Sequence, residues 1–396
     1  MIDKELKIMY ADVCHHLADR KLKPAFDMLG KMIGENSLEL HRDEWRNLEQ
    51  TYNLMLKYTV EGIQDPERQK IYRKLIVSVY KLADTLYEAA RLKISSSIEY
   101  ERKRSVQNLV KPDFKDFLSL LEDFYLQEEL KSLADESDLK TENKTEDAKS
   151  HQQKMIILFN HLWLKDKFSD EEAAFLKEFF SSGLIHDAYK SFIVSAIILS
   201  LQRHFDQKKF AVLFDVYDLQ NVETTQRALI GLLINFYKYD SRMPFFPALT
   251  SRLQIINEDP EFKQNLERSI IQLIRSRETE KIQQKIKDEI IPEMIKISPN
   301  LKDKINLEGL MEEGLDDDKN PEWQEIFKDS PGLMDKMEEF SELQMEGADV
   351  FMGSFAMLKM YPFFSEFTNW FVPFFTQNPQ VTHLVNNEDE TYKWFM

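Results

Sequence analysis

The chain has 396 residues, and its 43% hydrophobic and 31% charged residues are the balance of a folded protein with a hydrated surface. Only 10 residues are glycine, and no Asn-Gly or Asp-Gly dipeptide occurs, which argues against a protein built from β-hairpins. The formal net charge of −17 disfavours general nucleic-acid binding, because phosphate backbones repel an acidic surface.

The N-terminus and the single cysteine bear on the location of the protein. Cys14 has no second cysteine with which to form an intrachain disulfide, as is usual in a reducing compartment. Residues 1–5 lack the basic and apolar regions of a signal peptide. No run approaches the roughly 18 apolar residues of a transmembrane helix. The sequence therefore predicts a cytoplasmic protein without membrane insertion.

Residues 1–134 are the first predicted region, an N-terminal helical bundle. In residues 74–90 apolar side chains recur at i, i+3 and i+4, as on one wide helix face. Residues 66–115 carry 12 Lys or Arg against 6 Asp or Glu, and they include Arg102-Lys103-Arg104. Two interpretations of this basic stretch stay open. It is either a hydrated helix face or a surface for an acidic partner or for the chain's own acidic segment.

A polar run of mixed charge over residues 135–150 is the predicted linker to a helical region at 151–308. Ser169 and Glu172 predict a capping box at the start of one helix in that region. Breaker-free stretches and cap residues predict three helix pairs, at 170–180 with 186–203, 208–217 with 222–239, and 247–256 with 260–274. The sequence thus predicts an all-α protein.

The second helices of these pairs begin roughly 36–38 residues apart, a spacing typical of helical repeats. Asn221-Val222-Glu223, followed by Arg227-Ala228 and Leu232-Leu233, resembles the second helix of a HEAT repeat. The arginine has no counterpart in the first pair. The resemblance covers roughly residues 169–300, and the whole chain is similar to bacterial solenoid proteins in which a HEAT-like part precedes tetratricopeptide repeats. It implies an α-α superhelix whose concave face binds protein.

The last predicted region, residues 309–396, is first acidic and then aromatic. Between residues 303 and 350 there are 16 Asp or Glu and 4 Lys. Residues 351–375 then hold ten aromatic side chains, and so large an apolar surface is expected to be buried. We expect it to be buried, in order of preference, in the internal core, against a continuation of the helical array, or against a separate protein partner. The predicted protein-binding residues are Phe363, Phe364, Phe367, Trp370 and Phe371.

Motifs that carry chemistry are missing from the sequence. It has no glycine-rich phosphate loop, no Gly-x-Ser-x-Gly elbow and no paired histidines at helical metal-site spacing. Cys14-His15-His16 cannot grip one ion from a single helix, since consecutive side chains point about 100° apart. Asp316-Asp317-Asp318 lacks the alternating ligands of a calcium loop. His186, at the start of a predicted helix, is predicted to be a surface or capping residue rather than a base. We therefore predict no catalytic, cofactor-binding or metal-binding residue and no small-molecule substrate.

These observations predict a non-catalytic scaffold or adaptor that binds another protein, chiefly through the concave face of residues 169–300. One alternative is a HEAT-like nucleic-acid-acting enzyme of the DNA-glycosylase kind, which needs a basic concave face. The basic stretch lies outside the repeat-like region, which weighs against that alternative. Another alternative is an N-terminal fragment of a longer repeat protein.

Overall fold

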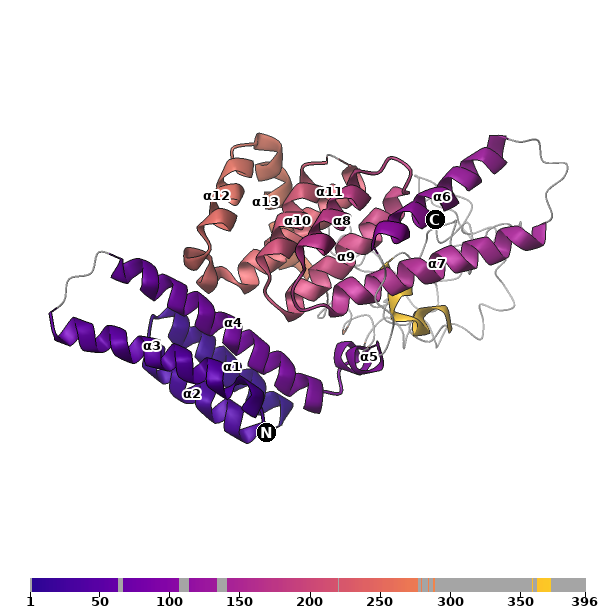
Figure 1. Ribbon diagram of the computed structural model, residues 1–396. Helices are drawn as coiled ribbons and strands as arrows, with labels where there is room; N and C mark the ends of the chain where they lie inside the picture. The colour runs from indigo at the N-terminus through magenta and orange to yellow at the C-terminus, as the bar shows by residue number, and fades with distance from the viewer. Residues whose placement is uncertain are drawn as a thin grey trace. The chain divides into compact units, whose positions relative to one another are not determined.

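The structure is a computed structural model, and it describes residues 2–62, 67–106, 114–133, 141–219, 221–276 and 362–371, with single residues at 279, 284, 288 and 358. Throughout this part of the chain the regular elements are helices, without a strand, as the sequence predicted (Figure 1). No helix among the described residues combines the length and apolar composition that a membrane crossing requires. The chain forms two compact units, Met1–Asp259 with Trp370–Met396, and Pro260–Asn369.

The first four α-helices of the first unit pack around one core (Figure 1). The core consists of apolar side chains with almost no exposed surface, among them Leu17, Phe26 and Val79. Each such side chain contributes about 1.5–3 kcal/mol to the free energy of folding. These helices, with the short 3-10 helix η1, are α1 (Asp3–Ala18), α2 (Leu22–Glu35), η1 (Glu39–His41), α3 (Arg42–Val60) and α4 (Arg68–Ile94).

Helix α3 covers the bundle without burying any side chain fully. Its inner face, which includes Trp45, Tyr52 and Met55, is partly buried against the core. Trp45 lies directly on α2, where a Cβ added to Gly30 would stand 3.1 Å from the indole. The Trp45 ring nitrogen donates to the Phe26 carbonyl at 3.0 Å. The outer face of α3 therefore stays available at the surface.

The remaining α-helices of the first unit pack in two layers. Helix α9 lies beside α7 and α11, while α10 lies beside α8 and α12. The approach of α9 to α11 is close, because a Cβ added to Gly231 would stand 2.4 Å from Ile198. These elements are α5 (Ile98–Val106), α6 (Phe114–Leu133), α7 (Thr141–Leu164), α8 (Asp170–Ser181), α9 (Asp187–Arg203), α10 (Gln207–Tyr217), α11 (Val222–Lys238), the 3-10 helix η2 (Asp240–Phe245) and α12 (Pro247–Ile256).

Helix starts follow the predicted cap chemistry. The capping box of Ser169 and Glu172 is present, with the Glu172 amide donating to Ser169 Oγ at 3.1 Å and Glu172 Oε2 accepting from the Ser169 amide at 2.7 Å. His186 caps α9 as predicted, since its Nδ1 accepts from the Ala188 amide at 3.1 Å. Asn221 caps α11 in the same way, through the Thr224 amide. Local capping therefore explains why these helices begin where they do.

Two parts of the chain complete the description. In the second unit, α13 spans Pro260–Arg275, and the 3-10 helices η6 and η7 span Pro362–Ser365 and Phe367–Phe371, the last crossing into the first unit. The expected linker over 135–150 overlaps α7, because that helix already begins at Thr141. The acidic segment at 303–350 lies outside the described residues.

Candidate functional site

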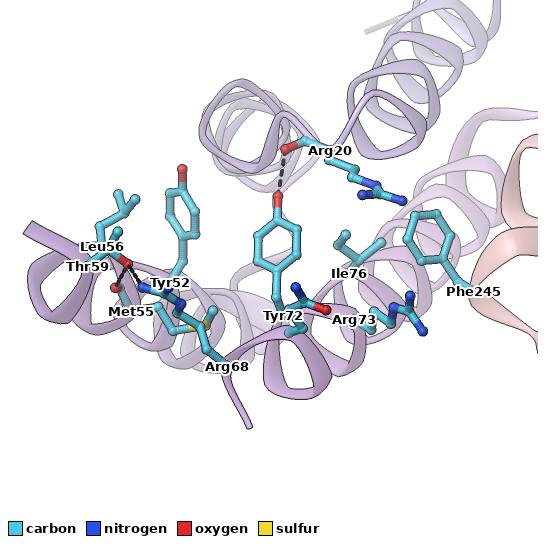
Figure 2. Close-up of a pocket in the computed structure, with 11 residues that line it drawn as sticks. Arg20, Tyr52, Met55, Leu56, Thr59, Arg68, Tyr72, Arg73, Ile76 and Phe245 are labelled. Carbon is cyan, nitrogen blue, oxygen red and sulfur yellow. Dashed lines mark hydrogen bonds between the residues drawn. The ribbon is translucent and has the colours of Figure 1, made fainter. Parts of the chain in front are cut away.

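A pocket of about 340 Å³ opens on the N-terminal bundle, where α3 and α4 face each other (Figure 2). Its walls come from residues spaced three or four apart on both helices, so one face of each helix contributes. Arg20, just after α1, and Phe245, at the end of η2, complete it. The volume falls in the range of about 300–1,000 Å³ that is usual for ligand sites.

Arg20 adopts a backbone conformation that usually belongs to glycine. Its φ is 61°, and it directly follows the C-terminal cap of α1. The amide of Lys21 donates to the His16 carbonyl at 2.7 Å, and the amide of Arg20 donates to Leu17 at 3.0 Å. This is the Schellman arrangement, which places a left-handed residue after the helix. The hydroxyl of Tyr72 donates to the Arg20 carbonyl at 2.7 Å and ties this turn to α4.

Three guanidinium groups line the pocket. Arg20 and Arg73 lie on the side of Phe245, while Arg68 reaches the other side and donates to Thr59 Oγ1 at 3.1 Å (Figure 2). No hydrogen bond or ion pair joins the guanidinium of Arg20 or of Arg73 to a described residue. Among the described residues, no Asp or Glu lines the pocket. The pocket is therefore locally positive in a chain whose net charge is −17.

The walls between these charges are apolar and aromatic, with Tyr52, Met55, Ile76 and Phe245 among the lining residues. Apolar side chains near the C-terminal end of α3 also remain exposed to solvent. Leu56, which lines the pocket, and Val60, one turn later and 87% exposed, form an apolar rim on the pocket side, whereas Leu54 and Tyr58 belong to the outer face of α3. Together the pocket and this rim form an apolar surface with a cationic lining.

A buried ion pair holds the η2 segment, and with it Phe245, against the bundle. Arg242 of η2 donates two hydrogen bonds to Asp84 of α4, both at 2.8 Å, and a third to the Tyr10 hydroxyl at 2.7 Å. The guanidinium also stands 4.5 Å from the ring centre of Tyr80. Burial opposes the charge of Asp84, but Arg242 brings the pKa of that carboxyl below its ordinary value. Phe245 follows three residues later, so this pair positions the pocket wall.

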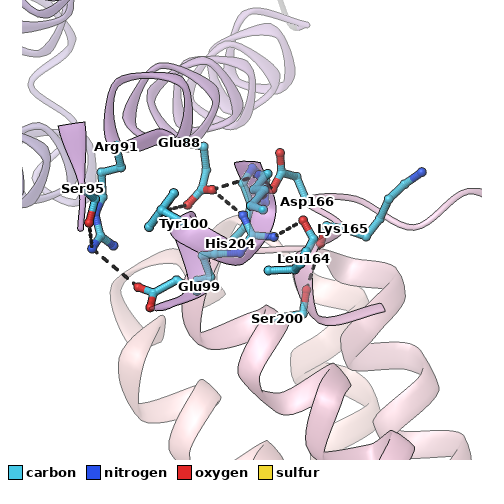
Figure 3. A network of polar contacts seen from close by, with 12 residues as sticks. Glu88, Arg91, Ser95, Glu99, Tyr100, Leu164, Lys165, Asp166, Ser200 and His204 are labelled. Atoms are coloured by element: carbon cyan, nitrogen blue, oxygen red, sulfur yellow. Dashed lines mark hydrogen bonds and ion pairs between the residues drawn. The ribbon is translucent and has the colours of Figure 1, made fainter. Parts of the chain in front are cut away.

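A second buried network joins the same face of α4 to α5 and α9 (Figure 3). Glu88 lies one turn after Asp84 and accepts from Tyr100 at 2.6 Å, from Lys103 at 3.3 Å and from Arg203. Lys103 also donates to Asp166 at 2.5 Å. Lys103, the central residue of the basic run Arg102-Lys103-Arg104, therefore pairs with carboxylates of its own chain. At this position the basic stretch is neither a hydrated helix face nor a surface for an external partner.

Lys209 is the buried residue that most resembles a reactive group. Burial lowers its pKa to about 7, the range of many lysine nucleophiles and bases. Its ammonium, however, donates to the carbonyls of Lys165 and Asp166, both at 2.7 Å, and to Ser200 Oγ at 2.9 Å. These carbonyls follow the C-terminus of α7, where a cation is favourable. With all three donors used and no exposed surface, Lys209 has a structural role.

A smaller hollow of about 190 Å³ lies between α8 and α10. Its carboxylates, Asp215 and Asp218, are engaged by Arg252 of α12 at 2.6 and 2.8 Å. The hollow is below the usual size of a ligand site, and both of its carboxylates already pair with Arg252.

The five aromatic residues proposed from the sequence are all half-buried. The rings of Phe363 and Phe364 meet edge to face at 5.0 Å. Phe371 packs against Phe159 of α7 at 5.3 Å, and its carbonyl accepts from Arg227 of α11 at 3.2 Å. Phe371 thus has an internal packing contact, and partner binding by Phe363, Phe364, Phe367, Trp370 and Phe371 stays a prediction.

Metal and thiol chemistry find little support in the geometry. The described residues contain no cluster of three or more His, Cys, Asp or Glu side chains that could hold a metal ion. Burial raises the pKa of the Cys14 thiol, which keeps it protonated and unreactive. The Asp316-Asp317-Asp318 run lies outside the described residues.

Sequence reasoning pointed to part of the pocket and missed the rest. Arg68 and Arg73 belong to the basic stretch at 66–115. Arg20 and Phe245 lie far away in the sequence, and no local pattern connects them to α4. A basic residue directly after a predicted helix end is the one signal that could have drawn attention to Arg20.

Comparison of the chain with protein-family models, curated proteins and solved structures found no match. The function is therefore inferred from the geometry of the site.

Proposed function

We propose that this chain is a non-catalytic protein-interaction scaffold and that the pocket between α3 and α4 is a docking site for a partner protein. The observation that carries the proposal is the pocket itself, with the guanidinium groups of Arg20 and Arg73, which have no partner among the described residues, and the exposed apolar rim on α3. Arginine and tyrosine in a concave apolar site are typical of the residues that dominate binding energy at protein interfaces.

The proposal includes a HEAT-like architecture for the region after α7. Along the chain α9 follows α8, α11 follows α10 and α13 follows α12, and these second helices begin at Asp187, Val222 and Pro260. First helices lie beside first helices, as α8 beside α10 and α10 beside α12, and α9 lies beside α11. Such stacking is expected of a repeat array, because each pair needs neighbours to bury its apolar faces.

Charge reversal in the pocket tests the docking site. Tagged full-length chain, with and without Arg20→Glu combined with Arg73→Glu, is used to recover partners from native lysate, with quantification by mass spectrometry. We expect a stoichiometric partner with the wild type and about a tenfold or greater loss with the double variant, since two favourable charges become repulsive.

A matched control reverses two positive charges of the same helical bundle at positions outside the pocket. Arg46→Glu with Lys57→Glu alters two α3 side chains that are 63% and 66% exposed and do not line the pocket. This variant should retain the partner. Equal recovery by the pocket variant and the wild type, with circular dichroism showing both folded, would count against docking at the pocket.

A further inference from the structure

We infer that the pocket accepts an acidic peptide segment in which carboxylates flank one bulky apolar side chain. The inference rests on the proposed protein-binding function and adds the chemistry of the partner segment. In this arrangement the carboxylates meet Arg20 and Arg73, and the apolar side chain lies against the partly exposed rings of Tyr72 and Phe245.

The charge of the pocket calls for an anionic ligand. Other arginines of the described chain, such as Arg91, Arg203 and Arg252, already face carboxylates. Arg20 and Arg73 face no carboxylate among the described residues, where their guanidinium groups make no hydrogen bond, and this leaves their donors for bidentate pairing with ligand carboxylates. Both side chains are exposed, so pairing does not require them to be desolvated beforehand.

The walls of the pocket call for an apolar group on the same ligand. The partly exposed rings of Tyr72 and Phe245 lie between or beside the cationic groups (Figure 2), and the Tyr72 hydroxyl already donates within the chain. A small inorganic anion would satisfy the arginines and leave these surfaces in contact with water. A phenylalanine, leucine or tryptophan side chain would cover them and gain the free energy of apolar burial.

A peptide fits the surroundings better than a nucleic acid does. The exposed rim of Leu56 and Val60 offers aliphatic surface, which apolar side chains of a peptide can cover. A nucleic-acid strand would present a charged backbone there. The net charge of −17 would also repel a long polyanion more strongly than a short acidic segment.

Selection of peptides on the folded protein tests this chemistry. Random dodecapeptides displayed on phage are selected on the immobilised full-length chain and counter-selected on the Arg20→Glu, Arg73→Glu variant. We expect enriched peptides to contain two or more Asp or Glu around a Phe, Leu or Trp. A fluorescein-labelled enriched peptide should bind the wild type and the Arg46→Glu, Lys57→Glu control alike, and the pocket variant about tenfold or more weakly.

The same assay separates the possible failures. Variants of the peptide with Glu→Gln and with Phe→Ser, and a single-stranded DNA dodecamer, are measured beside it. Equal binding of the Glu→Gln peptide would overturn the acidic class while protein docking at the pocket still stood. Tighter binding of the DNA, lost in the pocket variant, would overturn the peptide in favour of nucleic acid. Recovery of no pocket-dependent peptide would also overturn the inference, and the lysate experiment would then decide the proposed function separately.

Discussion

At the scale of single residues, Arg20 lines the pocket although its backbone adopts a conformation that is unfavourable for a residue other than glycine. The left-handed conformation costs a non-glycine residue roughly 1–2 kcal/mol, because Cβ approaches the following carbonyl. Ser37 occupies the equivalent position after α2, with φ of 53° and the outer hydrogen bond of the same motif, from the Leu38 amide to the Ile33 carbonyl at 3.0 Å. Only Arg20 of these two lines the pocket.

Replacement of Arg20 by glycine should therefore separate stability from binding. We expect Arg20→Gly to raise the free energy of unfolding by up to about 1 kcal/mol, since the strain is removed while the unfolded chain gains freedom. The affinity for the acidic peptide should fall severalfold. Urea unfolding and fluorescence anisotropy measure the two effects.

Ser37→Gly provides the matched control for this prediction. It should change the free energy of unfolding in the same direction and leave peptide affinity unaltered. Undiminished affinity in Arg20→Gly would show that the Arg20 side chain does not contact the ligand.

At the scale of elements, a histidine in an aromatic cage joins α6, α7 and α9. His151 of α7 is 2% exposed and stacks on Phe124 at 4.1 Å, with the edges of Tyr125 and Tyr189 at 4.9 and 5.0 Å. Neither ring nitrogen has a hydrogen-bond partner among the described residues. Burial, with a smaller contribution from Lys154, lowers the pKa of His151 to about 4. The cage therefore holds a neutral ring.

This packing makes the stability depend on pH in a defined window. In the unfolded chain His151 takes up a proton below about pH 6.5, whereas in the folded chain it stays neutral down to about pH 4. The unfolded state then binds more protons, so stability falls as the pH falls through this window, by about 3 kcal/mol in total. His151→Phe keeps an aromatic ring in the cage but cannot bind a proton, so the variant should not lose this stability at low pH.

Urea unfolding between pH 7 and pH 4 checks the prediction by measuring the free energy of unfolding of the wild type and of His151→Phe at each pH. The difference between the two should favour the variant increasingly towards low pH. His15→Gln, which alters a histidine with a 72% exposed side chain, should produce no such trend. Parallel profiles for wild type and His151→Phe would contradict the cage as the cause.

At the scale of the first unit, α4 binds distant segments through two buried carboxylates on one face. Asp84 holds Arg242 of η2, just after α11, and Glu88 holds Arg203, the last residue of α9. The Asp84 and Arg242 positions are separated by 158 residues. Since Phe245 follows Arg242, the same attachment that joins the bundle to the α9–α11 layer also completes the pocket.

Removal of one partner should therefore affect both the fold and the pocket. Asp84→Asn leaves a buried guanidinium without its counter-charge, which costs about 3–5 kcal/mol. We expect a lower thermal midpoint and weaker peptide binding. In Asp84→Leu combined with Arg242→Met, apolar groups replace the whole pair, and much of the stability should return. An unchanged midpoint in Asp84→Asn would show that the ion pair does not hold η2 in place.

Local features of the structure could be predicted from the sequence. The scarcity of glycine, the three- and four-residue periodicity and the cap residues Ser169 and His186 all act within about one helical turn. These features can therefore be recognised from residues that are close together in the sequence. The helices α8 to α13 begin and end within a residue or two of the predicted bounds.

The pocket and the buried ion pairs could not be predicted in this way. Many carboxylates and cations of the chain are chemically equivalent in sequence, and only packing decides that Asp84 meets Arg242 or that Lys103 meets Asp166. Desolvation then makes these particular pairs important, while similar pairs on the surface contribute little. The sequence by itself determined an all-helical chain, because helix formation is local. The tertiary structure alone decided where the unpaired arginines gather, because that depends on contacts between helices far apart in the chain.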